Sequence, residues 1–354
     1  MPTLAVRPLN PRDIPAMRHV SQRRDRLDMT DAVDPPQPDV ADQLLATIPA
    51  NLRQGRVYVA LVDGELCAWM TFLPHASRFR WDVLAVAAGS PRLDATDDVC
   101  VELWSALLEY AVRQAGESGA KRLFATAADD GAAYDSLRAA GFERYAQFMI
   151  LAGTRPSGPV GLPEGMRRQD DSDVWSIHQL YHHVTPRAVQ FAEALTSSVW
   201  ESPQRGLIAR LGGMPPKPKA FVLDTRNGVQ AYCAIHVRRG GAMARLMISP
   251  ECRALAVPLV LAAASEAGVD PSCRLRVLVP GYAGELVLGF QDAGFELEHE
   301  RTAMVRHTTA PVVVHARLAP LPVEARERVP RGVPTYLRNA RRADPERGTG
   351  SPGA

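Results

Sequence analysis

The sequence predicts an α/β (α+β) protein made of two tandem copies of one fold, each a mixed central sheet flanked by helices, plus a disordered C-terminal tail. Three observations predict this class. The chain has 354 residues, enough for about two domains at ~150 residues each. Strand and helix patterns recur in the same order in both halves, about 160 residues apart. A stretch rich in Gly and Pro, 153–165, separates the two halves.

Composition excludes several classes of protein. The chain is 46% hydrophobic and 23% charged, as in an average globular protein and unlike a disordered chain, a collagen or a coiled coil. The longest apolar run, 254–264, is shorter than the ~20 residues of a membrane span. The N-terminus lacks a basic stretch followed by an apolar core, so we expect no secretory signal. The five cysteines form no CxxC pair, which favours reduced thiols and a cytoplasmic protein.

The first elements of each half are a short strand and a helix start, followed by a hairpin. Residues 6–17 and 166–177 superpose with arginine on the strand and aspartate near the helix start. Residues 56–72 and 219–237 are each two apolar runs around a tight turn, at Asp63-Gly64 and Asn227-Gly228. Both dipeptides predict a hairpin turn with two residues at positive φ.

The remaining elements follow in the same order. A third strand, next to the hairpin, is predicted at 81–86 and at 243–248. In the first half an amphipathic helix follows this strand, because apolar residues between 100 and 115 recur at helical spacing. Another strand comes next, at 122–128 or 274–280. Each half then has a short helix ending in Ala-Gly-Phe-Glu, where glycine suits a left-handed helix end.

These patterns set the expected domain boundaries. We expect an N-terminal domain over 1–153, a linker over 154–164, a C-terminal domain over 165–318 and a tail over 319–354. The tail contains six prolines, seven arginines and one aromatic residue, too little apolar surface to fold.

The order of elements, the Asp-Gly hairpin, the long helix and the Ala-Gly-Phe-Glu end resemble the GCN5-related N-acetyltransferase (GNAT) superfamily, over about 4–152 and 165–315. The tandem layout is similar to that of the mycothiol synthases. The resemblance implies acetyl-CoA, or another acyl-CoA, as co-substrate and an amine as acceptor, with no metal. In the superfamily the pyrophosphate of CoA lies on backbone N–H groups at a helix start, between splayed fourth and fifth strands.

The superfamily's cofactor loop has its better match in the second half. There Ile248, Pro250, Glu251 and Arg253 match the pattern. Alanine or proline replaces the loop glycines, which narrows the space for phosphate. The resemblance implies that the cofactor-binding residues are Met247, Ile248, Arg253, Ala254, Leu255 and Ala256. In the first half the motif positions fall on Val99, Glu102 and Trp104, so we expect that half to be degenerate.

Candidate catalytic residues are divided between the halves. An acyl transfer to an amine needs a base and a donor for the oxyanion. The superfamily's fourth-strand carboxylate is matched by Asp82 in the first half, while His236 and Glu251 are the substitutes in the second. The superfamily's tyrosine acid is replaced by Leu137 and Phe290. Tyr134 and Tyr282 lie nearby as displaced alternatives or as packing residues.

Two histidines sit one helical turn apart in the second half. His178 and His182 have a spacing that can hold a metal, but no HExxH glutamate accompanies them. A structural role is one alternative, and contact with the acceptor substrate is the functional one.

Two function hypotheses follow. The first is an acyl-CoA-dependent N-acyltransferase that acts on a small-molecule or peptide amine, with CoA in the C-terminal half. The second is a catalytically inactive tandem GNAT pseudoenzyme that binds a ligand or a protein partner. The formal net charge is +2 and much of it lies in the tail, so a nucleic-acid partner is not favoured. We also expect no membrane partner.

Overall fold

The structure, a computed structural model, describes residues 3–17, 19–20, 23–28, 56–75, 79–90, 93–158, 160–201, 218–238 and 241–308. They belong to one compact unit that runs from Met1 to Thr309. The predicted tail, 319–354, lies outside the described residues. The proposed boundaries of the two domains stay a prediction.

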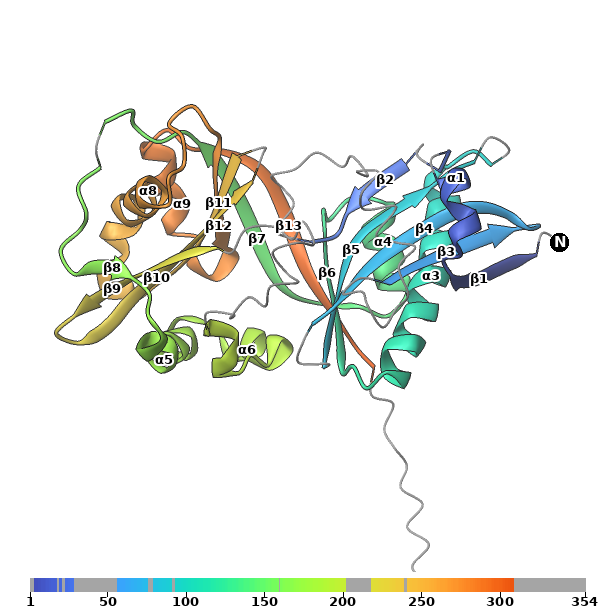
Figure 1. Cartoon of the computed structure of the whole chain (residues 1–354), viewed down its shortest axis with the longest axis horizontal. Helices are drawn as coiled ribbons and strands as arrows, with labels where there is room; N and C mark the ends of the chain where they lie inside the picture. The colour runs from blue at the N-terminus through green and yellow to red at the C-terminus, as the bar shows by residue number, and fades with distance from the viewer. Residues whose placement is uncertain are drawn as a thin grey trace, which may run out of the picture. The chain divides into compact units, whose positions relative to one another are not determined.

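Both halves have the predicted order of elements, except that the N-terminal half contains one further strand, β2, which the sequence did not predict (Figure 1). The N-terminal half contains β1 (Leu4–Pro8), a 3-10 turn (Pro11–Asp13), α1 (Ile14–Met17), β2 (Arg23–Arg26), β3 (Arg56–Val62), β4 (Glu65–Pro74), β5 (Arg80–Ala88), α3 (Asp97–Glu117), β6 (Arg122–Ala127), α4 (Ala132–Ala139) and β7 (Glu143–Gly153). The C-terminal half contains β8 (Met166–Arg168), a 3-10 turn (Asp171–Asp173), α5 (Val174–Val184), α6 (Arg187–Glu193), a 3-10 turn (Ser197–Trp200), β9 (Lys219–Thr225), β10 (Gly228–Arg238), β11 (Gly241–Ile248), a 3-10 helix (Pro250–Leu255), α8 (Ala256–Glu266), β12 (Leu275–Pro280), a 3-10 turn (Gly281–Ala283), α9 (Leu286–Asp292) and β13 (Glu296–His307).

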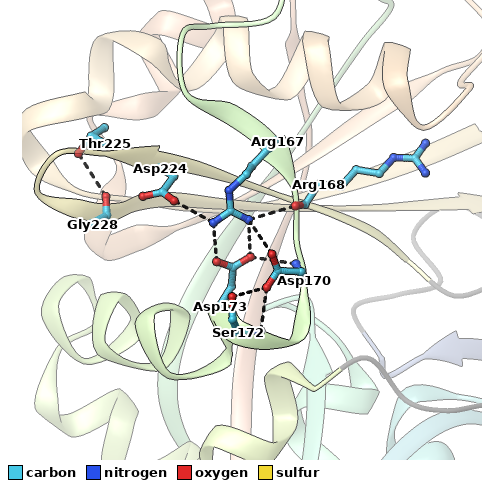
Figure 2. Close-up of polar contacts among 8 residues, drawn as sticks. All are labelled: Arg167, Arg168, Asp170, Ser172, Asp173, Asp224, Thr225 and Gly228. Atoms are coloured by element: carbon cyan, nitrogen blue, oxygen red, sulfur yellow. Dashed lines mark hydrogen bonds and ion pairs between the residues drawn. The ribbon is translucent and has the colours of Figure 1, made fainter.

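The repeat is visible in one side-chain contact at the start of each half. Arg7 binds Asp13 through two hydrogen bonds of 2.6 and 2.9 Å, and Arg167 binds Asp173 through two of 2.7 Å. Each aspartate also accepts a hydrogen bond from the backbone N–H three residues earlier. In the second half Arg167 reaches Asp224 as well (Figure 2). The same fork therefore closes the first turn in both copies.

The two hairpins differ in their turns. Asp63 and Gly64 both have positive φ, 51° and 83°, as predicted. In the second hairpin the prediction is wrong by one residue: Gly228 (φ 87°) is already paired with Thr225, and Asn227 is not among the described non-glycine residues with positive φ. A shift of register between Val229 and Ala231 follows. The turn is therefore still a two-residue turn, at Arg226 and Asn227, and a similar register shift between Ala60 and Leu61 occurs in the first hairpin.

The described strands form one 13-stranded sheet that runs through both halves. The order is β1-β3-β4-β5-β6-β13-β7-β12-β11-β10-β9-β8, with β2 paired to β5. The last strands are exchanged between the halves. β13 lies between β6 and β7, and β7 pairs with β12. Each copy thus completes the sheet of the other (Figure 1).

Helices cover both faces of this sheet. Buried residues of α3 and α4 pack with β3–β6 on one face, and those of α8 and α9 pack with β9–β12. On the opposite face α1 packs over β3–β5, and α5 packs over β9–β11. Ala192 of α6 packs with Phe124, Tyr145 and Val305. This second face is therefore shared by both halves at their junction.

Candidate functional site

In the C-terminal half, the two parallel strands separate within the described residues, and no described segment fills the gap between them. β11 and β12 pair from Ala242↔Leu275 to Arg245↔Leu278 and no further. The N–H of Ala242 donates to Arg274 O, and that of Ser249 donates to Gln230 O on the other side. Even-numbered residues of β11 therefore direct their amides toward β12. Ile248 lies beyond the last pair, so its amide faces the gap.

The matching gap in the N-terminal half is filled by the chain itself. β5 and β6 pair only from Arg80↔Arg122 to Asp82↔Phe124. β2 then pairs with β5 along residues 85–88. The N–H of Leu27 donates to Leu84 O at 2.8 Å, while Leu27 O accepts from Thr126 N at 2.7 Å. Leu27 is 2% exposed. An extended segment of the protein thus occupies this notch, as an extended ligand would.

A cavity of about 260 Å³ lies between the start of α8 and α9. It is lined by Arg253, Ala254, Ala256, Val257, Glu285, Leu286 and Gly289. Three of the six predicted cofactor residues thus line it. Of the others, Ile248 faces the gap, Met247 packs against α5 on the opposite face, and Leu255 is partly exposed outside the cavity lining.

The backbone around this cavity differs from a glycine-rich phosphate cradle. Residues 250–255 are a 3-10 helix that continues into α8. The Cys252 and Ala256 N–H groups donate to Ser249 O and Arg253 O, so they are not free for an anion. Arg253 forms an ion pair of 2.7 Å with Glu285 across the cavity. Glu251 is exposed at the helix start, where its own N–H lowers the pKa of its carboxyl.

The three predicted catalytic residues do not come together. Glu251 is at the helix start. His236 is on β10, where it pairs with Met243 of β11, and Met243 is two residues or ~7 Å along the strand from Arg245. Asp82 is on β5, six strands or ~29 Å from His236 across the sheet. Asp82 binds His75 at 2.5 Å and Arg80 at 2.8 Å. Burial opposes ionisation, yet these two partners outweigh it and lower the pKa of the Asp82 carboxyl.

His178 and His182 belong to a directional hydrogen-bond chain. Trp200 Nε1–H donates to His178 Nδ1 (3.2 Å), and the two His Nε2 atoms lie 3.2 Å apart. His182 Nδ1 lies 2.6 Å from Gln190 Oε1, and Gln190 Nε2 donates to the His182 and Thr185 carbonyls. The Trp200 donor at one end and the Gln190 Oε1 acceptor at the other assign a proton to His178 Nε2 and to His182 Nδ1. With a proton on one Nε2, the pair cannot chelate a metal.

The residues at the family's acid position are core residues. Leu137 and Phe290 are fully buried. Tyr134 is also buried in the core. Tyr282 lies in the turn after β12 and is only partly buried; burial is the main cause that raises the pKa of its hydroxyl.

The sequence analysis did not identify two residues of opposite charge, Arg245 and Glu193, on the side of the sheet that α5 and α6 cover. Arg245, the last paired residue of β11, shares its face with Met247 and is exposed. Glu193, the last residue of α6, accepts a hydrogen bond from Tyr181 Oη at 2.8 Å. Both charges act on the pKa values of Tyr145, Tyr181 and Tyr282. No motif surrounds either residue, and Tyr145 arrives from the other half through the exchanged strand, so no local signal could have found the group.

Two kinds of feature are absent from the described part of the chain, a cluster of metal ligands and a membrane-spanning helix. No group of three or more His, Cys, Asp and Glu side chains there is arranged to hold a metal ion. No helix there has both the length and the apolar character that crossing a bilayer requires.

Comparison with known proteins identifies the fold. Neither a protein-family model nor a curated protein sequence matches the chain. Among solved structures, the chain is similar to a GCN5-related N-acetyltransferase from Sphaerobacter thermophilus, with a TM-score of 0.51 and 14% identity over 87% of this chain and 96% of that one. A tandem GNAT protein from the clavulanic acid biosynthesis pathway is similar with a TM-score of 0.49 and 14% identity, over 87% and 99%. The chain has the GNAT fold, and the resemblance recognised in the sequence is confirmed at this level.

Proposed function

We propose that this protein is an acyl-CoA-dependent N-acyltransferase with one cofactor site, in the C-terminal half. It transfers an acetyl group from acetyl-CoA to the amine of a small molecule or peptide. The amine nitrogen attacks the thioester carbon, a C–N bond forms as the C–S bond breaks, the amine loses one proton, and CoA leaves as the thiol.

The contrast between the two notches carries this proposal. Pantetheine is an extended chain with two amide groups, and β2 is an extended chain whose amides pair with β5 in the first notch. In the second notch, no described strand pairs with Ile248 on the side of β12. The cavity between α8 and α9 provides a place for the rest of the cofactor. Arg253 supplies a cation for its phosphates once it leaves Glu285.

A second candidate function, a ligand-binding pseudoenzyme, is favoured by the closed backbone at residues 250–255 and by the apolar residues at the usual acid position. It predicts cofactor binding without transfer. For the acyltransferase, by contrast, Tyr282 and Glu193 are the described groups in this region that could donate or accept a proton.

The experiment is a calorimetric titration of the whole protein with acetyl-CoA. We expect one site per chain with a micromolar Kd, ~8 kcal/mol. Gly289→Leu should remove binding by filling the cavity, because a Cβ there meets only Val257 Cγ2 at 3.9 Å and the helix tolerates it. Leu288→Gln, an exposed change outside the cavity lining of α9, is the matched control. Two sites, or none at millimolar ligand, contradict the proposal.

A further inference from the structure

We propose that the acceptor is an amine that also carries a carboxylate, such as a free amino acid, bound between Arg245 and Glu193. This inference rests on the proposed acyltransferase function and names its substrate class. It assigns the carboxylate to Arg245 and the ammonium group to Glu193. The ammonium group gives one proton to Glu193, and through it to solvent, before its nitrogen attacks; the second proton leaves with CoA as the thiol.

Arg245 lies where an acceptor must arrive. It is the last residue of β11 paired with β12, so it stands at the vertex of the open gap. Its side chain alternates with those of Ala244 and Leu246, which pack toward α8, and therefore faces the α5 and α6 side. The residue is exposed, and no described residue forms an ion pair with it. Burial raises the pKa values of Tyr145, Tyr181, Tyr232 and Tyr282, and the nearby charge of Arg245 opposes that rise.

Glu193 supplies the opposite charge on the same face. Tyr181 Oη donates to Glu193 Oε2 at 2.8 Å, which holds the carboxylate beside α5, on the face of the sheet that α5 covers. The next residue, Ala194, has φ 43°, a left-handed conformation that a non-glycine residue rarely adopts. This turn ends α6 directly after Glu193. Backbone strain of this kind persists where surrounding structure imposes it, often beside functional groups.

A β-bulge in β7 adds a third residue, Tyr145 of the N-terminal half, to this group. Ala303 pairs with Ala146 and Met304 pairs with Arg144, so Tyr145 is the extra residue on β7. Bulges redirect side chains and are frequent beside active sites. The Tyr145 ring packs at 6.0 Å on Phe124, and its hydroxyl is within the field of both Glu193 and Arg245. Tyr145, Tyr181 and Tyr282 thus share both charges.

The charge arrangement selects the ligand. Arg245 and Glu193 form no ion pair with each other, although both act on the same three tyrosines. A ligand with an ammonium and a carboxylate a few bonds apart satisfies both. An amine that carries no carboxylate offers the Arg245 guanidinium no anion. A polyamine would place a second cation beside it.

The test compares amino acids with their amides. The full-length protein is saturated with acetyl-CoA and offered the twenty L-amino acids and the matching α-carboxamides, which lack the carboxylate, while thiol release is measured. We expect at least one amino acid to be turned over with a kcat/KM at least tenfold above that of its amide. Arg245→Gln should raise the KM of that amino acid at least tenfold and remove the preference. Arg226→Gln, in the exposed turn of the second hairpin, is the control.

Each outcome decides one of the two proposals. Acetyl-CoA binding is titrated for every variant in parallel, because neither charged residue lines the cofactor cavity. If the wild-type protein does not bind acetyl-CoA, the proposed function fails. If it binds acetyl-CoA but acetylates neither amino acids nor amides, the proposed function fails, because the pseudoenzyme accounts for binding without transfer. If it acetylates the amides as efficiently as the amino acids, or keeps its preference in Arg245→Gln, the acceptor inference alone is overturned. Glu193→Gln provides a second variant, expected to lower kcat/KM at least tenfold with acetyl-CoA binding unchanged.

Discussion

Arg167 and Asp173 form a two-pronged ion pair, with both hydrogen bonds at 2.7 Å. Arg7 and Asp13 repeat this contact in the other half. Asp173 is 4% exposed, and the hydrogen bonds from Arg167 lower the pKa of its carboxyl. The pair fixes the first strand to the first helical turn in each copy, which places α5 over the sheet in the second.

Replacing Asp173 with Asn should destabilise the protein by about 2 kcal/mol at neutral pH, because charged hydrogen bonds to a buried group are lost. The folded pKa of Asp173 is depressed, so its contribution is present above the unfolded pKa of ~3.9 and is lost as pH falls through the folded value. Urea denaturation at several pH values checks this. A difference between wild type and variant that grows below pH ~4 would contradict it.

His178 should titrate below the ~6.5 of an ordinary histidine. Burial, and then the neighbouring His182, lower its pKa, and protonation of Nδ1 would break the bond from Trp200. The unfolded chain takes up the proton first, so the stability from His178 is present above pH ~6.5 and is lost as pH falls below it. NMR titration of the histidine rings measures the shift. Trp200→Phe, which removes the donor, should raise the pKa of His178.

Ala194→Gly should stabilise the protein by about 0.5 kcal/mol. A left-handed alanine costs about 1 kcal/mol that glycine avoids, and the greater freedom of glycine in the unfolded chain offsets about half. Thermal unfolding measures the difference. Asp63→Gly is the matched comparison at another positive φ, with a smaller gain, because aspartate tolerates this region and its carboxylate accepts from Thr3 N–H. A loss of stability in Ala194→Gly would be contrary to this account.

Leu27→Ala should destabilise the protein by about 3 kcal/mol, the usual cost of truncating a buried leucine. The backbone bonds of residue 27 to Leu84 and Thr126 remain, so the first notch stays filled. We therefore expect no second acetyl-CoA site in calorimetry. Leu288→Ala, at a position 67% exposed, should change stability by less than about 0.5 kcal/mol. A second binding site in Leu27→Ala would show that the segment merely competes with the cofactor.

The two halves should unfold together. Because β13 pairs with β6 and β7 pairs with β12, neither sheet is complete without the other half. Calorimetric unfolding should show one transition with equal calorimetric and van't Hoff enthalpies. Separately expressed residues 1–153 and 154–354 should each lack a cooperative transition. Two resolved transitions in the full chain would refute this expectation.

Local patterns predicted the fold well. Arg7 with Asp13, the Asp63-Gly64 turn and the paired Ala-Gly-Phe-Glu ends are short-range signals, and each copy confirms the other. The Asn227-Gly228 turn was placed one residue late, because Thr225 pairs with Gly228 and leaves Arg226 and Asn227 as the turn, a register that the dipeptide alone does not fix. The strand exchange could not be predicted, because the hydrophobic pattern of β7 and β13 is compatible with pairing to either β6 or β12.

The site was predicted only in part. Ala256 and Arg253 follow a sequence motif, and the structure places both at a cavity. Filling of the first notch by Leu27 depends on a segment with no motif, and it is decided by tertiary pairing. Arg245 and Glu193 are single charges on different elements, 52 positions apart in the chain, which only folding brings near the same tyrosines.

The exchanged strands also bear on how the protein is made. A ribosome releases β6 before it has synthesised β13, the strand that pairs with it. Roughly 170 residues separate the two, which at ~5–20 residues per second leaves the edge of β6 open for ~10–30 s. An unpaired edge is a template for pairing with other nascent chains. The N-terminal copy therefore cannot mature during its own synthesis, and its yield in the cell should depend on chaperones that bind the growing chain.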